Sequence, residues 1–251
     1  MTYTKPTHFR EVLIEGATAR LEESLKVKAN TPKPTIIIPT PASINNPENY
    51  IILEGRTHGK YNYEDLIVSK TVYHKNKNWN QAHELLHQDG EYMLTIKQFV
   101  DFLTTLKSRN AYDGKGNKIS SSELENIFNE ITEVRAPWRA EWLDAKFEDT
   151  NILYGHRIQN GILVPTYTQQ LEAHLSQNKT PGIDLQDWLT NANEHGLPIE
   201  KTKNGKLYYW SPANNSVARF IAYSDWALLD CSGGAEGSYT SLGVRPSRKK
   251  I

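Results

Sequence analysis

The sequence predicts an α+β fold in which a short strand region is followed by helices and then by many short strands joined by long loops. Hydrophobic residues recur at helical spacing mainly between residues 79 and 133, whereas β-branched and aromatic runs lie before and after that stretch. The regular strand–helix–strand alternation of a doubly wound fold is missing. The composition, with 38% hydrophobic and 23% charged residues, is that of a globular protein.

The first 49 residues differ from the rest of the chain. Leu13, Ala17 and Leu21 recur at helical spacing and predict a helix over residues 10–28. Five prolines between residues 29 and 49 break any helix and favour an extended arm. We therefore expect an N-terminal helix and Pro-rich arm over residues 1–49, followed by one domain over residues 50–251.

The first half of that domain combines three strand signals with three helices. The Trp79 helix is expected to end at Gly90, because glycine commonly follows the last turn of a helix. Ser120 and Glu123 have the spacing of a capping box at the start of the third helix. In chain order, we expect strands at 50–55 and 63–72, a helix at 79–88, a strand at 93–94, a helix at 96–107, a turn at 113–117 and a helix at 120–133.

The second half is predicted to be mostly β. Strands are expected at 142–147, 152–156, 207–210, 217–231 (a strand pair or a strand with a bulge) and 242–245. Residues 181–189 have the pattern of a turn followed by a short helix. The stretch from 155 to 215 is loop-rich, and long ordered loops on a β scaffold commonly serve binding.

Bulk properties exclude several classes of protein. Lys+Arg and Asp+Glu both number 29, so no general nucleic-acid affinity is expected. We find no secretory signal in residues 1–10 and no apolar run long enough to span a bilayer. The compartment stays open between the cytoplasm and display on a cell or virion surface. The single cysteine, Cys231, excludes an intrachain disulfide and is expected to be a small buried hydrophobe. We expect a monomer with no cofactor.

Two sets of residues resemble the C-type lectin fold. Trp79-x-x-Ala82-x-x-x-Leu86-x-x-x-Gly90, followed by Met93, Phe99 and Leu103, resembles its opening helices. The ending is similar to that of its formylglycine-generating-enzyme branch, through Tyr208-Tyr209-Trp210-Ser211, Val217-Ala218-Arg219-Phe220 and Leu242-Gly243-Val244-Arg245-Pro246. The resemblance covers residues 50–248. It implies small twisted, mainly antiparallel sheets, two flanking helices and long ordered loops.

More narrowly, residues 142–248 resemble the variable proteins of archaeal diversity-generating retroelements. In those proteins a reverse transcriptase rewrites adenine-templated codons near the 3′ end of the gene, and the altered side chains form a ligand-binding face. The resemblance implies a ligand-binding protein that is not an enzyme, with a variable region at about 217–245. The ligand it implies is a protein or another surface-exposed macromolecule.

Residues 221–239 are the expected contact region. Small residues alternate there with a chemically mixed set, and the Gly-, Ser- and Tyr-containing stretch has the composition of a paratope. The alternative is that Tyr223, Trp226 and Leu228 are core residues of a buried strand pair. The predicted contact residues are Ile221, Tyr223, Asp225, Trp226, Leu228, Asp230, Ser232, Gly233, Gly234, Glu236 and Tyr239.

The strongest competing motif is His-Glu-x-x-His at residues 83–87. On a helix, His83 and His87 share a face and could hold zinc, with Glu84 as the general base of a metalloprotease. The third ligand is poorly supplied, because Met93 occupies the position where one class of such enzymes has a histidine.

The lectin-type reading assigns the same helix differently. It places Ala82, Leu85 and Leu86 in the core and His83, Glu84 and His87 on the outside. We therefore predict no metal site. The zinc metalloprotease is kept as an alternative, together with a structural surface or virion protein that binds no small ligand.

Two further expectations concern large side chains. Arg219 and Arg245 are expected to be buried partners of carboxylates or carbonyls rather than catalytic groups. The core and the packing of the long loops are expected to contain Trp138, Trp142, Trp188 and Trp210.

Overall fold

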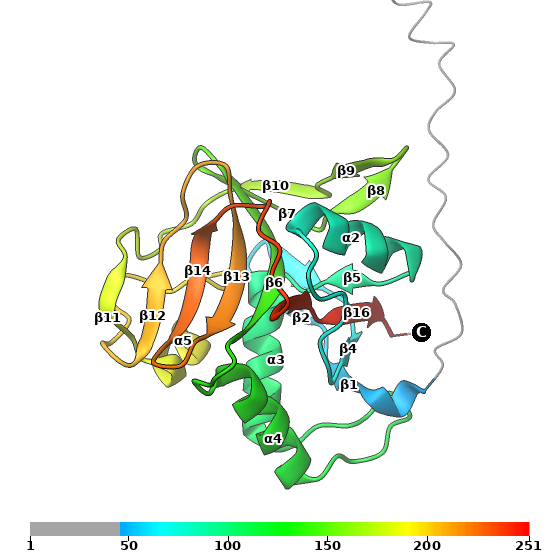
Figure 1. Cartoon of the computed structure of the whole chain (residues 1–251). Helices are drawn as coiled ribbons and strands as arrows, with labels where there is room; N and C mark the ends of the chain where they lie inside the picture. The colour runs from blue at the N-terminus through cyan, green and yellow to red at the C-terminus, as the bar shows by residue number, and fades with distance from the viewer. Residues whose placement is uncertain (1–45, 251) are drawn as a thin grey trace, which may run out of the picture. The chain divides into compact units, whose positions relative to one another are not determined.

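A computed structural model describes residues 46–250 of the chain (Figure 1). The helix expected over residues 10–28 and nearly all of the Pro-rich arm lie outside the described residues. The described part mixes helices with several mainly antiparallel sheets, so the predicted α+β class is confirmed at that level. No helix within residues 46–250 combines the length and the apolar character needed to cross a membrane.

The elements fall into two groups along the chain. The first group, up to residue 132, contains η1 (Pro47–Asn49), β1 (Tyr50–Leu53), β2 (Arg56–His58), β3 (Tyr61–Tyr63), β4 (Leu66–Ser69), α2 (Trp79–Gln88), β5 (Tyr92–Met93), α3 (Ile96–Ser108) and α4 (Ser121–Thr132). The second group contains β6 (Arg139–Glu148), β7 (Asn151–Tyr154), β8 (Arg157–Gln159), β9 (Ile162–Val164), β10 (Tyr167–Gln170), β11 (Lys179–Ile183), α5 (Leu185–Asn191), β12 (Leu207–Trp210), β13 (Ser216–Ala222), β14 (Ala227–Gly233), β15 (Leu242–Val244) and β16 (Pro246–Lys249).

Local capping explains where the first two helices begin. The side chain of Asn78 accepts a hydrogen bond from the backbone N–H of Gln81, and Gln81 accepts one in return from the Asn78 N–H. Thr95 and Gln98 form the same reciprocal pair at the start of α3. Each pair satisfies backbone N–H groups that have no partner inside the helix. Both helices therefore begin within a residue of the predicted positions.

The capping box expected for α4 is only half formed. The Ser120 hydroxyl accepts a hydrogen bond from the Glu123 backbone N–H at 3.2 Å, as predicted. The Glu123 carboxylate instead accepts a hydrogen bond from the Lys70 ammonium at 2.6 Å. An ion pair with β4's neighbouring loop has thus replaced the return hydrogen bond of the box.

Two main sheets organise the fold. The smaller has the strand order β1-β4-β16-β5, and the larger has the order β10-β7-β6-β13-β14-β12-β11, with β15 paired to β6 (Figure 1). Only the β12–β14 and β15–β6 pairs in these sheets are parallel. The chain passes from the large sheet at β15 directly into the small sheet at β16. Strand β16 was not predicted, because the final strand was expected to end at Arg245.

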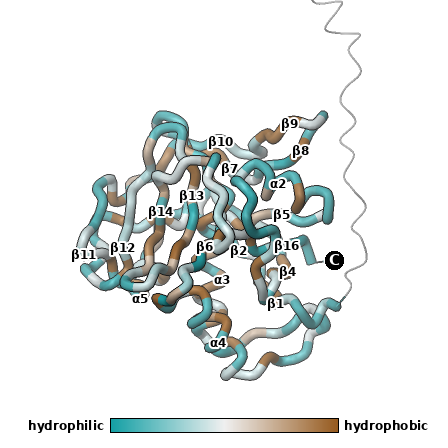
Figure 2. The backbone as a smooth tube through the Cα atoms, viewed as in Figure 1, coloured by the Kyte–Doolittle hydropathy of each residue, from teal (hydrophilic) through white to brown (hydrophobic). Residues whose placement is uncertain are grey.

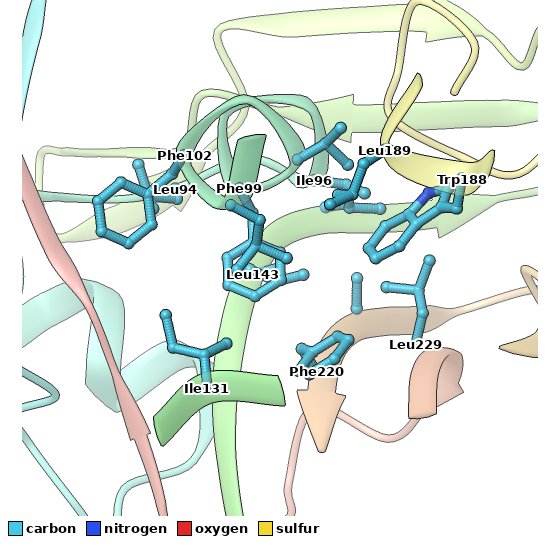
Figure 3. Close-up of a cluster of buried hydrophobic side chains, with 14 of the residues drawn as sticks. Leu94, Ile96, Phe99, Phe102, Ile131, Leu143, Trp188, Leu189, Phe220 and Leu229 are labelled. Atoms are coloured by element: carbon cyan, nitrogen blue, oxygen red, sulfur yellow. The ribbon is translucent and has the colours of Figure 1, made fainter. Parts of the chain in front are cut away.

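The main core lies between helix α3 and the large sheet (Figure 3). Phe99 of α3 lies 5.3 Å, between ring centroids, from Phe220 of β13, and Trp188 of α5 stacks on the other side of Phe220 at 6.4 Å. Leu143 and Leu229 come from β6 and β14 and are fully buried in the same cluster. The prediction that Trp188 is a core residue is confirmed.

A second hydrophobic cluster covers the opposite face of the same strands. Trp79, Ala82 and Leu86 of α2 pack there against Trp142 of β6 and Ile221 of β13. Figure 2 shows hydrophobic residues along β13, β14 and β4, with hydrophilic residues at the turns between strands. The central strands are therefore buried on both faces, which explains why β13 has an almost unbroken hydrophobic run.

Charges are also enclosed in the core. The Arg245 guanidinium donates to both oxygens of Glu141, at 2.7 and 3.1 Å, and to the Ser69 carbonyl at 2.9 Å. Arg139 contacts the same carboxylate. Burial raises the pKa of Glu141, but Arg245 and Arg139 lower it further, so the net pKa lies below its usual value. The prediction that Arg245 is a buried structural partner is confirmed.

The loop-rich region holds more regular structure than expected. Strands β8 to β11 and helix α5 all lie between residues 155 and 215. Residues 181–183 were predicted to be a turn and instead complete β11. A Cβ atom at Gly182 would lie 1.7 Å from the Leu207 carbonyl oxygen of β12. Glycine at 182 therefore permits close approach of two strands, which a sequence reads equally well as a turn signal.

Candidate functional site

Strand alternation places part of the predicted contact region on one face of the large sheet. Ile221 of β13 pairs with Leu228 of β14, and Arg219 pairs with Asp230. Cross-strand partners point to the same side of a sheet, so these side chains do share a face. Ile221, Leu228 and Asp230 are nevertheless buried.

The prediction that these residues face solvent is wrong. Ile221 and Leu228 belong to the second hydrophobic cluster, beneath α2 and a layer of aromatic side chains. Gly233, also predicted to be a contact residue, is buried as well. The remaining predicted contacts are accessible. Tyr223 and Trp226 are half-buried, and the exposed ones are Asp225, Ser232, Gly234, Glu236 and Tyr239.

Asp230 has a structural role on this face. Its carboxylate accepts hydrogen bonds from Nε of Arg219 at 2.9 Å and from the backbone N–H of Ser232 at 2.8 Å. The Arg219 guanidinium also lies over the Trp142 ring, 5.7 Å from its centroid. The predicted structural role of Arg219 is therefore confirmed. The pair fixes the irregular end of the β13–β14 ladder, where the register shifts.

Aromatic rings form a connected group beside the exposed residues. Trp226 is central: its ring lies 4.4 Å from Tyr223, 5.1 Å from Tyr208 and 6.0 Å from Trp210, between centroids. Trp138 lies 5.5 Å from Tyr223. We call the group the aromatic surface; it consists of Trp138, Tyr208, Trp210, Tyr223, Trp226 and Tyr239.

Three members of the aromatic surface were missed by sequence reasoning. Trp138 and Trp210 were predicted to be core residues, and Tyr208 was assigned only to a strand. All three are half-buried, whereas Trp142 and Trp188 are fully buried as expected. Buried and half-buried residues alternate along β12 in the structure. The sequence Leu-Tyr-Tyr-Trp has no polar alternation, so it carried no signal for which residues face outward.

Main-chain hydrogen bonds hold the segments that present these side chains. Tyr223 N–H donates to the Trp226 carbonyl at 2.9 Å, and Arg135 N–H donates to the Tyr223 carbonyl at 2.7 Å. In the next loop, Trp79 N–H donates to the Ala235 carbonyl at 2.9 Å. Asn76 N–H likewise donates to the Tyr239 carbonyl at 3.1 Å. The shape of both loops thus depends on backbone groups, which every residue except proline can supply.

Helix α2 places the His-Glu-x-x-His motif differently from either expectation. His83 is buried, with 4% of its surface exposed, whereas Glu84 is exposed and His87 is half-buried. The expectation that His83 lies on the outside is wrong, because Trp79, Ala82, His83 and Leu86 form the buried stripe of α2. Leu85, expected in the core, is only half-buried.

His83 faces two polar residues of distant segments. Its Nε2 lies 3.7 Å from Oδ1 of Asp144 on β6, and that same oxygen lies 2.5 Å from Nδ1 of His156. Within residues 46–250 this is the one group of three possible metal ligands that lie close together, and His87 is not in it. The zinc site of the metalloprotease alternative is therefore not assembled around His83 and His87.

All three residues are buried. Burial lowers the pKa of His83 to about 4, so its imidazole is neutral at physiological pH. Burial raises the pKa of Asp144, but His156 beside it lowers the pKa more, and the net value lies below the usual range. The Trp79 ring packs edge-on against both imidazoles, at 4.3 and 4.8 Å between centroids.

A cavity of about 200 Å³ adjoins Asp144. Tyrosines contribute much of its wall, and Arg157 stacks over the Tyr92 ring at 3.7 Å. The tyrosines that line it are Tyr61, Tyr63, Tyr92, Tyr154 and Tyr167. Asp144 thus contacts the two imidazoles and is also one of the residues beside this cavity.

Comparison of the chain with protein-family models, with curated proteins and with solved structures finds no match. What the described surfaces do must therefore be inferred from their own residues.

Proposed function

We propose that this protein binds a macromolecular ligand through the aromatic surface and the exposed residues beside it. We also propose that its scaffold is C-type-lectin-like, and that a diversity-generating retroelement alters the stretch at about 217–245. The observation that carries the proposal is the aromatic surface itself, in which rings from β12, the β13–β14 turn and two other loops are in contact while remaining partly exposed.

The chemistry of this surface suits a protein ligand. Tyrosine and tryptophan supply large rigid contact areas at low entropic cost, and they dominate the energetics of protein interfaces. Tyr239 is 49% exposed. Asp225, next to Trp226 in the chain, and Glu236, close to Tyr239, are also exposed. A half-buried aromatic centre with a polar rim is the usual arrangement of a protein interface.

Backbone support makes exchange of these side chains compatible with folding. Main-chain hydrogen bonds hold the segment 223–226 to Arg135, which precedes β6. Others hold the segment 234–241 to residues 76–79. Replacing Tyr223 or Tyr239 leaves those bonds in place. A scaffold that keeps its shape while its contact residues change needs this property.

Burial reduces the set of residues that can contact the ligand. Under the proposal, Ile221, Leu228, Asp230 and Gly233 belong to the scaffold, because changes there disturb the second hydrophobic cluster or the Arg219–Asp230 pair. The contact residues become Tyr223, Asp225, Trp226, Ser232, Gly234, Glu236 and Tyr239. The protein then needs no catalytic group.

Sequencing this gene from many cells of one population tests the proposal. We expect substitutions concentrated in adenine-containing codons of 217–245, at the accessible positions named above. Codons for β6 and β7 provide the internal control and should be nearly constant. Substitutions spread evenly over the gene, or falling mainly on Phe220 and Leu229, would contradict the proposal.

A display experiment tests the binding capacity separately. In one library of the full chain, codons 223, 225, 226, 232, 236 and 239 are randomised. In a matched library, exposed positions 121, 122, 125, 126, 133 and 134 around α4 are randomised. Binders to unrelated purified proteins should be enriched from the first library. Equal enrichment from both libraries, or failure of most first-library members to fold, would refute the role of the aromatic surface.

A further inference from the structure

We propose that His83, Asp144 and His156 form a binding site for a divalent transition-metal ion such as Zn²⁺. The ligands would be Nε2 of His83, a carboxylate oxygen of Asp144 and Nδ1 of His156. They come from α2, β6 and the residue before β8, and these ligand atoms all lie within 4.8 Å of one another. The site is separate from the aromatic surface and does not depend on the proposed binding function.

The spacing of the donor atoms fits a small metal ion. Zinc bonds of about 2.0–2.2 Å in tetrahedral geometry place neighbouring ligand atoms roughly 3.4 Å apart. The separation between His83 Nε2 and Asp144 Oδ1 is 3.7 Å. The contact between His156 Nδ1 and Asp144 Oδ1, at 2.5 Å, is shorter. It is a hydrogen bond, and it would lengthen when a metal ion takes the place of the proton between the two atoms.

An unpartnered nitrogen points to a missing ligand. Nε2 of His83 is buried and has no hydrogen-bond partner. A buried polar atom without a partner destabilises the folded state, so native structures rarely leave one. Coordination would satisfy this nitrogen. The neutral imidazole that burial enforces on His83 is also the form that binds metals.

The surroundings hold the ligands in place. Oδ2 of Asp144 accepts a hydrogen bond from the backbone N–H of His156 at 3.0 Å, which fixes the carboxylate. The Trp79 indole, anchored by its own 3.0 Å bond to the Leu143 carbonyl, packs against both imidazoles. Such outer contacts orient metal ligands and raise affinity.

Three protein ligands leave one position open in a tetrahedral site. A water molecule would occupy that position, as in other zinc sites with three protein ligands. Two imidazoles and one carboxylate are a donor set that zinc and iron(II) accept, and one that magnesium and calcium do not favour.

The test uses the full chain after treatment with a chelator. Co²⁺ is titrated in and followed by visible absorption and calorimetry, and Zn²⁺ is then added to displace it. We expect one metal ion per chain and a rise in melting temperature. His83→Ala and His156→Ala should each weaken binding by more than about 100-fold, the upper range for loss of an outer-shell partner.

Matched variants of the same helix separate this site from the His-Glu-x-x-His motif. His87→Ala and Glu84→Gln should bind metal as the unmodified chain does. Equal loss in His87→Ala and His83→Ala would overturn the proposal, as would the absence of stoichiometric binding by the unmodified chain.

A measurement on the unmodified chain covers the possibility that the variants do not fold. Imidazole nitrogen NMR should show Zn²⁺ shifting the resonances of His83 and His156 and not those of His87. Unchanged resonances of His83 and His156 at saturating Zn²⁺ would refute the site, because neither imidazole would then be bound to the metal.

Discussion

The two faces of the large sheet are built from the same strands and closed in different ways. On one face, Phe220 and Leu229 are enclosed by helices α3 and α5 (Figure 3). On the other, Ile221 and Leu228 are covered by α2 at one end and by the aromatic surface at the other. The helix-covered face is part of a tightly packed core, whereas the outermost side chains that cover the second face are partly exposed.

The difference shows how a protein can separate stability from recognition. A helix that closes a core must keep its packing residues, because interiors are close-packed. Half-buried rings on segments that are held by backbone hydrogen bonds can be substituted with a smaller loss of stability. The following predictions compare the two faces, from the largest expected effect to the smallest.

The largest effect is expected for the charge enclosed on the helix-covered face. Glu141→Gln removes the fully buried carboxylate between Arg245 and Arg139, leaving only the half-exposed Glu130 to compensate their charge. The free energy of unfolding, measured in urea, should fall by about 3–5 kcal/mol at neutral pH. Glu130→Gln is the matched control, because that carboxylate is 45% exposed although it also contacts Arg245.

The same residue predicts a pH dependence. The folded-state pKa of Glu141 lies below its usual value of 4.5, so its ionised form stabilises the fold above that pH. This stabilisation is lost as the pH falls from about 4.5 through the folded-state pKa, because the unfolded chain then binds more protons. Urea titrations at several acidic pH values should show a shallower decline for Glu141→Gln. Parallel declines would contradict the assignment.

A leucine pair compares the two faces directly. Leu229 and Leu228 are adjacent in β14, fully buried, and point to opposite faces. Leu→Ala changes in cores destabilise by about 2–5 kcal/mol, depending on how far the site can collapse. Leu229→Ala should fall near the top of that range, and Leu228→Ala near the bottom because the aromatic surface can settle onto it. Equal losses in urea unfolding would mean that both faces are equally rigid.

Truncation at the centre of the aromatic surface should have a moderate effect. Trp226→Ala removes ring contacts with Tyr208, Trp210 and Tyr223 and partly uncovers the second cluster. We expect a loss of about 1–2 kcal/mol in urea unfolding, together with loss of binding in any ligand-binding variant selected by display. A loss above that of Leu228→Ala would identify Trp226 as a core residue.

The smallest effect is expected at the rim. Tyr239 is 49% exposed, and its carbonyl, not its side chain, anchors the loop to Asn76. Tyr239→Ser should change stability by less than about 0.5 kcal/mol, or roughly 1–2 °C in melting temperature. A larger shift would show that the loop depends on its side chains, which would weaken the proposal that this stretch is exchanged.

Local signals predicted much of the fold. The bounds of α2 and β12 match the expected 79–88 and 207–210, because the caps and the hydrophobic spacing that set them lie within the segments themselves. Gly182 was expected in a turn, but it permits close contact between two strands. The final strand was expected to end at Arg245, but Pro246 begins a new strand. Nothing local distinguishes these uses.

The candidate sites show a different limit. Alternation predicted which side chains of β13 and β14 share a face, but what covers that face comes from α2 and from residues 208–210, distant in sequence. His83 illustrates the same point, because the short motif named His87 as its partner while the fold supplies Asp144 and His156. Sequence pattern identifies neighbours along an element more readily than neighbours across the fold.

Strand β16 makes completion of the first sheet depend on an intact reading frame. Strand β16 lies between β4 and β5, and it follows the stretch proposed to be rewritten. A stop codon or frameshift introduced within that stretch would remove β16, leaving an edge of β4 unpaired and β5 without its partner. Such a truncated chain could not close its first sheet, and chains with unpaired strand edges are prone to aggregation and proteolysis.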